Sequence, residues 1–387
     1  EGVYIPKKEV KLSYAYPTVV GYKNNVGIGY KFKYQDPMGF KNLDFSVSYT
    51  PENWKNSLND DGRTLRDDEK WHASFNYRTA VMGGILPGIY NFYASYNKAD
   101  FYDLFGPTKR SRKGLNFGLS INKSLFSDAP KSLDLNLGFM GYYGLNQSPE
   151  FQQINFENKD FNTNLFYNIS SSFVYRNLRG STGAVDAEKG IKSTLSLSSA
   201  YTEGNLFPKV QGTLDLGFQL PINHTALWFR NAYGNSFTKS INPFTRFGFA
   251  SFGNNYIDNA SSKMYRNPYS FAGLSYDSDI SIIAKNFYKI TAELSLPPIR
   301  YRKFGFFNLF ANYTHPTIFA GSLFTNNYKD VSGKEMSATY RNIGFQMDTK
   351  LVMFSHLSST LSFGWARAFS IGADSNEFDE WMISLKF

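Results

Sequence analysis

The chain has 387 residues, 18% of them aromatic (27 Tyr and 37 Phe), a formal net charge of +9 and no cysteine. The missing cysteines exclude disulfides, thiolate catalysis and cysteine-ligated metal. No run of about 18 apolar residues is present, so a helical membrane protein is excluded. A transmembrane β-barrel stays compatible with the composition, because only every second residue of its strands meets lipid.

The positive charge is scattered among many predicted loops. The densest group is Lys109, Arg110, Arg112 and Lys113, in a polar segment between predicted strands. Such scatter does not indicate a nucleic-acid surface. Contact with anionic lipid headgroups or lipopolysaccharide and a simple solvated loop both remain open.

The first clear element is a hairpin. Apolar residues alternate with small or polar ones over 26–34 and again over 43–49, and the short turn DPMGFKN (36–42) joins the two runs. Strict alternation is typical of strands with one apolar and one polar face.

The same alternation recurs along the chain. After a first segment at 9–18 and the hairpin, further strands are predicted at 71–77, 90–96, 115–121, 133–139, 165–175, 195–201, 210–220, 224–236, 288–296, 307–313, 343–353, 361–365 and 378–387. The total is about sixteen strands, with Ser, Thr, Asn, Gly, Lys and Asp on the faces opposite the apolar stripes. We therefore predict an all-β fold, a transmembrane antiparallel barrel with a wet interior, over one domain, 1–387.

The predicted connections differ in length. Those near 36–42, 124–131, 203–208 and 297–303 are short, and those at 52–68, 98–112, 145–160, 177–189 and 323–340 are long and polar. Short turns at one end and long loops at the other are typical of outer-membrane barrels. Stripe residues expected to face lipid are Phe45, Phe117, Leu135, Leu216 and Phe363, whereas inward neighbours such as Asn116 and Asp215 are expected to tolerate substitution.

Residues 237–285 break the pattern. This segment lies between the eleventh and twelfth predicted strands and is rich in Gly, Asn and aromatic residues. A long insertion without alternation is functional or disordered. Its aromatic content argues against disorder, so we expect it to fold into the barrel lumen.

The chain ends on EFDEWMISLKF. Trp381, Ile383, Leu385 and Phe387 fall on one face of an extended strand, and Glu380, Met382, Ser384 and Lys386 fall on the other. A terminal amphipathic strand that ends in Phe resembles the assembly signal of bacterial outer-membrane barrels. An ordinary last strand of a soluble β-domain would show the same alternation.

Layout and three short stretches resemble the bacterial surface-antigen barrel superfamily, which includes BamA-like insertases and the two-partner-secretion translocators. The stretches are VGIGYKFKYQDPMGFKNL (26–43), NFYKITAELSLPPIR (286–300) and Tyr265-Arg266-Asn267-Pro268. The resemblance implies sixteen strands and a sixth loop folded into the lumen behind a V-R-G-F/Y tip. Here only the arginine of that tip is kept.

The resemblance further implies an acidic wall partner for Arg266. In the family this is an Asp on the thirteenth strand, but the corresponding stretch FGFFNLFANYTHP (304–316) has no acidic residue. Glu293 and Asp348 lie on the polar faces of neighbouring strands and can replace it. Tyr265, Arg266, Glu293 and Asp348 are therefore the candidate residues of a lumen plug.

Enzymatic chemistry finds little support. His72, His224, His315 and His356 show no metal-ligand spacing, and no nucleophile stands beside a base in the sequence. We expect no catalytic residue, no metal and no cofactor. By resemblance, the expected function is to move or insert polypeptide at the bacterial outer membrane, and a passive porin-like channel is the alternative.

The resemblance also implies context. We expect the barrel to be the C-terminal membrane domain of a longer protein, in contact with outer-membrane lipid, lipopolysaccharide, the barrel assembly machinery and a translocated polypeptide. No nucleic-acid partner is expected. The sequence does not determine the substrate or the oligomeric state.

Overall fold

The computed structural model describes residues 10–22, 25–51, 67–84, 86–98, 100–101, 112–144, 165–202, 204–238, 246–249, 252, 257–258, 263–274, 283–329, 335–354, 356–371 and 377–386. These residues are almost entirely strand and turn, with short 3₁₀ helices at Asp67–Glu69 (η1) and Met264–Arg266 (η3).

Long strands make up most of the described chain. They are β1 (Lys11–Tyr22), β2 (Asn25–Gln35), β3 (Lys41–Tyr49), β4 (Trp71–Val81), β5 (Gly88–Lys98), β7 (Arg112–Asp128), β8 (Lys131–Tyr143), β9 (Leu165–Arg179), β10 (Lys189–Thr202), β11 (Asn205–Gln219), β12 (Ala226–Ser236), β16 (Asn286–Ser295), β19 (Leu309–Lys329), β20 (Glu335–Met353), β21 (Leu357–Ile371) and β22 (Glu377–Lys386). Two-residue strands are β6 (Asp100–Phe101), β13 (Phe247–Gly248), β14 (Ile257–Asp258), β15 (Ile283–Ala284), β17 (Ile299–Arg300) and β18 (Gly305–Phe306).

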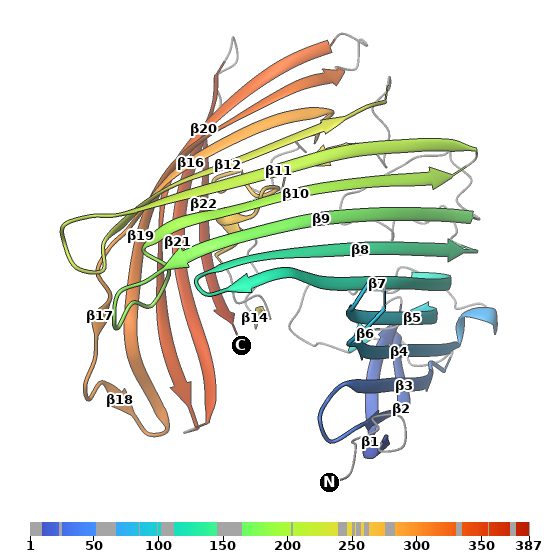
Figure 1. Cartoon of the computed structure of the whole chain (residues 1–387). Helices are drawn as coiled ribbons and strands as arrows, with labels where there is room; N and C mark the ends of the chain where they lie inside the picture. The colour runs from blue at the N-terminus through green and yellow to red at the C-terminus, as the bar shows by residue number, and fades with distance from the viewer. Residues whose placement is uncertain are drawn as a thin grey trace. The chain divides into compact units, whose positions relative to one another are not determined.

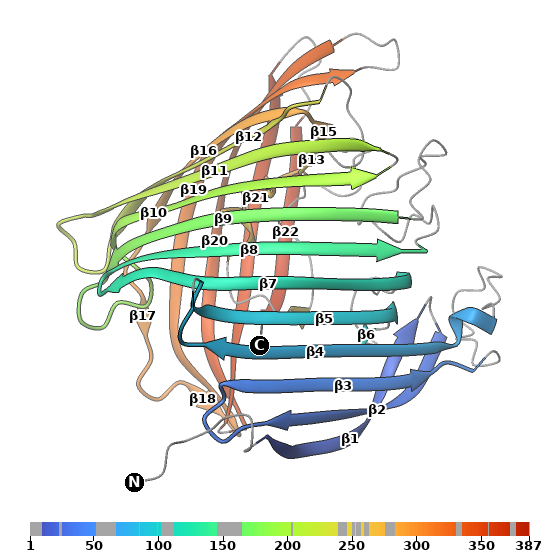
Figure 2. The ribbon, with the colours of Figure 1, turned by 45° about the vertical axis from the view of Figure 1, so that its right-hand side comes forward.

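The chain divides into two compact units, each described here by itself. Unit 1 comprises 1–125, 134–172 and 198–206, and unit 2 comprises 126–133, 173–197 and 207–387. In unit 1, β1, β2, β3, β4, β5 and β7 pair in sequence as antiparallel neighbours, and β6 adds to β1 (Figure 2). The predicted hairpin is confirmed, since Phe32 lies opposite Phe45 in the register of β2 and β3.

Unit 2 holds the second antiparallel series. Strands β11, β12, β16, β19, β20, β21 and β22 each pair with the next, without crossover, from yellow-green to red in Figure 1. Each pairing continues over about ten residues or more, for example from Thr339–Ile371 to Met353–Leu357 between β20 and β21.

Burial in unit 2 is inverted relative to a soluble sheet. In β16 the polar stripe Lys289, Thr291, Glu293 and Ser295 is buried, whereas Tyr288 on the apolar stripe is exposed. In β22 Glu380 and Lys386 are buried, whereas Trp381 and Ile383 on the apolar face are more than half exposed. An apolar face left open while a polar face is covered fits a strand that faces lipid on one side.

The predicted fold class is therefore confirmed as all-β, with long antiparallel strands in a large sheet, the strand arrangement of a large β-barrel. Among the residues that the structure describes, sixteen strands have nine or more residues, which agrees with the predicted number. The segment 237–285 also lies where expected, between the eleventh long strand, β12, and the twelfth, β16.

Some predicted boundaries are wrong. The stretch 323–340 is mostly strand, because β19 continues to Lys329 and β20 begins at Glu335. Phe307, predicted to open a strand, instead occupies the turn before β19, with a positive φ of 53°. The loop predicted at 177–189 is shorter, since β9 ends at Arg179 and β10 begins at Lys189. Strand order places this connection at the same end of the sheet as the turns 220–225 and 296–308, and not at the end of the long loops.

Candidate functional site

A segment of the 237–285 loop packs on the polar face of the unit 2 sheet. We call its described residues, 246–249, 252, 257–258 and 263–274, the inner segment, and the sheet face that they cover the inner face. Two short strands fix its course. Strand β13 pairs with β15 next to β16, and β14 pairs in parallel with Leu385 and Lys386 of β22.

Aromatic side chains anchor the inner segment in two places. The first apolar cluster contains Phe247, Phe249, Phe271 and Leu274 of the segment with Ala232, Ala284, Phe287, Leu323 and Ala368. The second contains Phe252, Tyr265 and Ala272 of the segment with Phe319, Ala366 and Met382. The rings of Tyr265 and Phe319 stack with centroids 4.2 Å apart. Burying such rings provides the main apolar stabilisation of the packed segment.

Glycines of the wall and of the segment make this contact possible. An added Cβ on Gly364 would lie 3.0 Å from Phe252 Cζ, and one on Gly344 would lie 2.6 Å from Phe319 Cζ. Gly273 of the segment has a φ of +98°, and its Cβ would lie 2.7 Å from the Ala368 nitrogen. A side chain at these positions would push the aromatic anchors or the segment off the wall.

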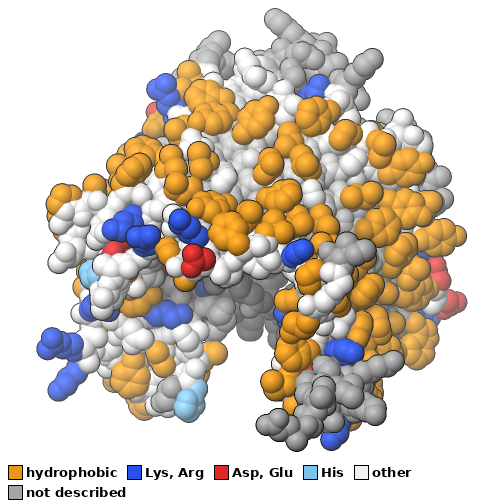
Figure 3. Space-filling view, viewed as in Figure 1, with side chains coloured by type: hydrophobic (Ala, Val, Ile, Leu, Met, Phe, Trp, Pro, Cys, Tyr) orange, Lys and Arg blue, Asp and Glu red, His pale blue; other side chains and the backbone are white. Residues whose placement is uncertain are grey.

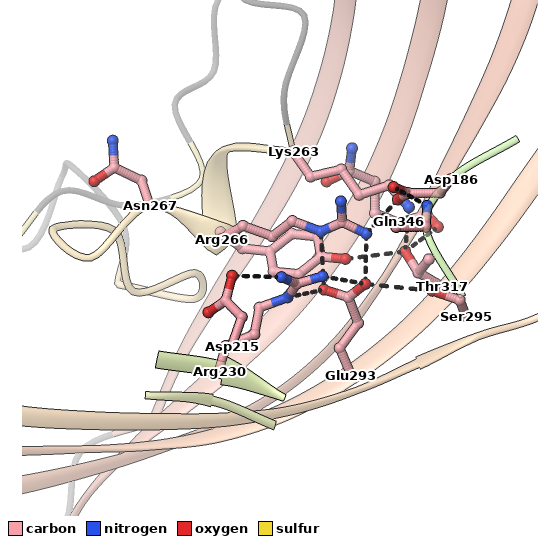
Figure 4. Close-up of polar contacts among 12 residues, drawn as sticks. Asp186, Asp215, Arg230, Lys263, Arg266, Asn267, Glu293, Ser295, Thr317 and Gln346 are labelled. Carbon is pink, nitrogen blue, oxygen red and sulfur yellow. Dashed lines mark hydrogen bonds and ion pairs between the residues drawn. The ribbon is translucent and has the colours of Figure 1, made fainter. Parts of the chain in front are cut away.

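Charged residues hold residues 265–268, which we call the tip of the inner segment (Figure 4). The Arg266 guanidinium donates to Glu293, with Nε 3.0 Å from Oε2 and Nη2 2.5 Å from Oε1. The same Nη2 donates to Asp186 Oδ2 at 2.7 Å. Arg230 of β12 donates to Glu293 Oε2 at 2.8 Å and to Asp215 Oδ2 at 2.9 Å. The Glu293 side chain is completely buried, so two guanidinium groups replace its lost hydration.

Two wall residues hold the segment by its backbone. The Lys289 ammonium donates to the carbonyl oxygens of Tyr265, Asn267 and Ser270 at 3.1, 2.7 and 2.6 Å. The Glu380 carboxylate accepts the Phe252 N–H at 2.8 Å and the Gly273 N–H at 2.8 Å. The segment thus brings carbonyls to a cation and amides to an anion, which satisfies groups that burial would otherwise leave unpaired.

A second ion pair lies beside the tip. Lys263 Nζ is 3.7 Å from Asp348 Oδ2, and Gln346 and Ser362 also donate to Asp348 at 2.7 and 2.6 Å. Burial, reinforced by the neighbouring Arg266 charge, lowers the pKa of Lys263 to about 8. Asp348 therefore forms an ion pair with Lys263, whereas Arg266 pairs with Glu293 and Asp186.

Of the residues singled out in the sequence, Arg266 and Glu293 are in direct contact in the structure. Tyr265 and Arg266 lie on the inner segment, and the structure places Glu293 against Arg266. On β22, Trp381 and Ile383 are exposed on the apolar face, which Leu385 shares, and Phe387 lies outside the described residues. Whether these residues act as a plug and as an assembly signal stays a prediction.

Three important wall residues were missed by sequence reasoning. Arg230, Lys289 and Glu380 were visible only as charges on the polar side of alternating strands. Alternation indicates the face of a side chain but not its partner, and the partners of Lys289 and Glu380 are backbone groups of a segment distant in sequence. Asp215, expected to tolerate change, instead holds Arg230.

Two histidines, His224 and His72, make hydrogen bonds with other described residues. Ser181 Oγ lies 3.3 Å from His224 Nδ1, and Glu188 Oε1 lies 2.8 Å from the same nitrogen. A nucleophile and an orienting carboxylate need opposite ring nitrogens, so this trio does not match a hydrolytic triad. In unit 1, buried His72 hydrogen-bonds Thr50 and the Asn97 carbonyl, which is a structural role.

Within the described ranges, no group of three or more His, Cys, Asp or Glu side chains could hold a metal ion. In the same part of the chain, no helix has the length and apolar character needed to cross a membrane.

Comparison with known proteins adds one structural likeness. No protein-family model and no curated protein sequence matches the chain. The structure is similar to that of CdiB from Acinetobacter baumannii, with 11% identity, a TM-score of 0.40, and 97% of this chain covered. The chain spans 59% of the length of that structure.

Proposed function

We propose that the chain is a transmembrane β-barrel of the bacterial outer membrane that moves or inserts polypeptide, and that the inner segment is its plug. The observation that carries this proposal is the cover on the inner face. Glu293, Lys289 and Glu380 are polar wall residues, and each is satisfied by the inner segment. A porin keeps such residues in contact with channel water.

The chemistry of the contact suits a gate. The tip is held by ion pairs and hydrogen bonds to side chains of the strands, whereas the strands themselves are held together by continuous backbone pairing. The segment can therefore leave the inner face without breaking the sheet. The charged side chains of the empty inner face, among them Lys289 and Glu380, would then offer partners to the backbone of an extended polypeptide.

The proposal includes the context expected from the resemblance. The long-loop end would face the cell exterior and the turn end the periplasm, with outer-membrane lipid and lipopolysaccharide around the exposed apolar stripe. The apolar face of β22, with Trp381 and Ile383, would be read by the barrel assembly machinery. The domain would follow periplasmic domains in a longer protein.

Single-channel recording of the purified full chain in a planar bilayer tests the proposal. A plugged translocator gives small, flickering current steps, because the segment leaves the inner face only briefly. Stable open steps of constant size would contradict the translocator and favour a porin-like channel.

A further inference from the structure

The turn between β16 and β19 forms an exposed aromatic and basic hairpin. Strands β17 and β18 pair with the start of β19, and the Tyr301 and Ala311 amides donate to Asn312 and Phe304 carbonyls at 3.0 and 2.9 Å. We call residues 299–307 the aromatic-basic hairpin. It is therefore an ordered extension of the sheet of unit 2 beyond the last residue of β16.

Its phenylalanines are among the most exposed apolar residues of the described chain. Phe304, Phe306 and Phe307 are 67%, 77% and 84% exposed, and Phe354 of the next turn is 68% exposed. Phe307 and Phe354 both have positive φ, at 53° and 50°, which bulky residues rarely adopt. The Phe354 amide donates to the Asn308 carbonyl at 2.7 Å, so the two turns are joined. The backbone thus presents these rings outward.

The exposed rings continue the apolar outer face of the sheet. Phe306 lies opposite Leu309, Leu309 opposite Met353, and Met353 opposite Leu357. One cross-strand row of apolar side chains therefore runs over β18, β19, β20 and β21 at the turn end. This row occupies the position of an interfacial girdle, where a lipid-facing stripe meets the headgroups.

The cations of the hairpin lack acidic partners. Arg302 and Lys303 are exposed and make no hydrogen bond or ion pair with any residue that the structure describes, whereas Arg300 donates to the Gly183 carbonyl. The sequence from 294 to 329 contains no Asp or Glu. In Figure 3, basic and hydrophobic side chains gather together near β17 and β18.

We propose that the aromatic-basic hairpin is an interfacial anchor that binds the headgroups of anionic phospholipid. Phe rings at the end of a lipid-facing stripe would enter the acyl boundary, and Arg302 and Lys303 would reach the phosphate level. The inference rests on the membrane placement of the barrel and not on polypeptide transport. A soluble protein partner would need the same residues in water, and the experiment separates the two.

The chain has no cysteine, so one introduced thiol reports one place. Asn308→Cys puts a fluorescent label beside the hairpin without removing a ring or a cation, and Asn223→Cys puts it in the exposed turn between β11 and β12 as a matched control. Each labelled full-length protein is reconstituted in phosphatidylcholine vesicles. Quenching is then measured with equal mole fractions of brominated phosphatidylglycerol or brominated phosphatidylcholine.

The hairpin label should be quenched more strongly by the anionic lipid, since each cation near a membrane surface contributes about fivefold to the preference. The difference should disappear in the Arg302→Gln/Lys303→Gln variant and in about 1 M salt, which shortens the Debye length to about 3 Å. The control label should show no such preference.

Equal quenching of the hairpin label by both lipids would overturn the proposal. Absence of quenching by either lipid would also overturn it, and would favour a soluble partner. Heat-modifiable migration of each variant shows that the barrel has folded, and Phe306→Ser/Phe307→Ser, which keeps both cations, should reduce quenching by both lipids.

Discussion

Glu293 is the residue on which the tip of the inner segment depends most. Its buried carboxylate accepts hydrogen bonds from Arg266 and from Arg230. The two guanidinium groups have further acceptors in Asp186 and Asp215. Removing either arginine therefore leaves Glu293 with one cation, whereas removing the carboxylate charge leaves two cations facing each other.

The Glu293→Gln and Arg266→Ala variants should consequently differ. We expect Glu293→Gln to lower the free energy of unfolding by about 3–5 kcal/mol, the cost of breaking a buried ion pair from one side. Arg266→Ala should cost only about 1–3 kcal/mol, because Arg230 still compensates the carboxylate. Urea unfolding of the barrel in detergent measures both values. Equal losses in the two variants would contradict the shared role of Glu293.

Glu380 should control how firmly the segment is held on β22. The Phe252 and Gly273 N–H groups both donate to the Glu380 carboxylate. In Glu380→Gln the remaining oxygen can accept one of these N–H groups, and the other loses a charge-assisted hydrogen bond worth about 1.5–3 kcal/mol. Hydrogen exchange at Phe252 and Gly273 should accelerate by roughly tenfold to a hundredfold. Glu377→Gln, an exposed change on the same strand, is the matched control and should leave both amides unchanged.

Asp186 gives the tip a dependence on pH. Burial raises the pKa of Asp186, but the adjacent Arg266 charge and hydrogen bond outweigh it, so the pKa lies below the ordinary 3.8. A lowered carboxyl pKa stabilises the folded state above the unfolded pKa, and this contribution is lost as the pH falls through the folded pKa. Wild type should therefore exceed Asp186→Asn in stability at neutral pH. The difference should begin to shrink as the pH falls below 3.8 and should vanish once the pH lies below the folded pKa. A difference that persists there would contradict the pairing.

Among the strands, the apolar stripe on the face opposite the inner face should tolerate no substitution by a charged residue. In β10, Leu195 is exposed on the apolar stripe, whereas Ser196 faces the opposite side. Arg at mid-bilayer on a lipid face costs about 2–4 kcal/mol. Leu195→Arg should thus reduce folding into vesicles, and Ser196→Arg should fold like wild type. Equal folding yields for the two variants would show that this face does not meet lipid.

Strands could be predicted because alternation is a local property. The hairpin of β2 and β3, the order of sixteen long strands and the exposed face of Trp381 and Ile383 all follow from side chains that point alternately to opposite faces. The ends of β19 and β20 could not be predicted, because beyond Phe324 their stripes become polar and Asn-rich. The two strands continue there through backbone pairing, which does not require an alternating pattern of side chains.

The site could be predicted only in part. Arg266 and Glu293 were recognised through a resemblance, because the sequence alone does not show which anionic strand residue lies close to a cation in a loop. The contacts of Lys289 and Glu380 were beyond prediction. Their partners are carbonyl and amide groups, which every residue has, and only the folded path of the inner segment selects which ones meet the wall.

At the scale of the whole molecule, one part of the chain shields another. The wall strands expose apolar residues on one face and charged residues on the other, and the inner segment of the same chain covers the charged face in unit 2. We propose that this cover blocks a conducting path and can be released.

The most direct test is the conductance of a chain lacking residues 246–274. The remaining 237–245 and 275–285 still join β12 and β16, which are neighbouring strands, so the wall can form without the inner segment. We predict that wild type conducts in small, flickering steps, and that the shortened chain conducts in steady steps severalfold larger. If the two proteins give the same trace while both migrate as folded, heat-modifiable barrels, the inner segment is not a plug.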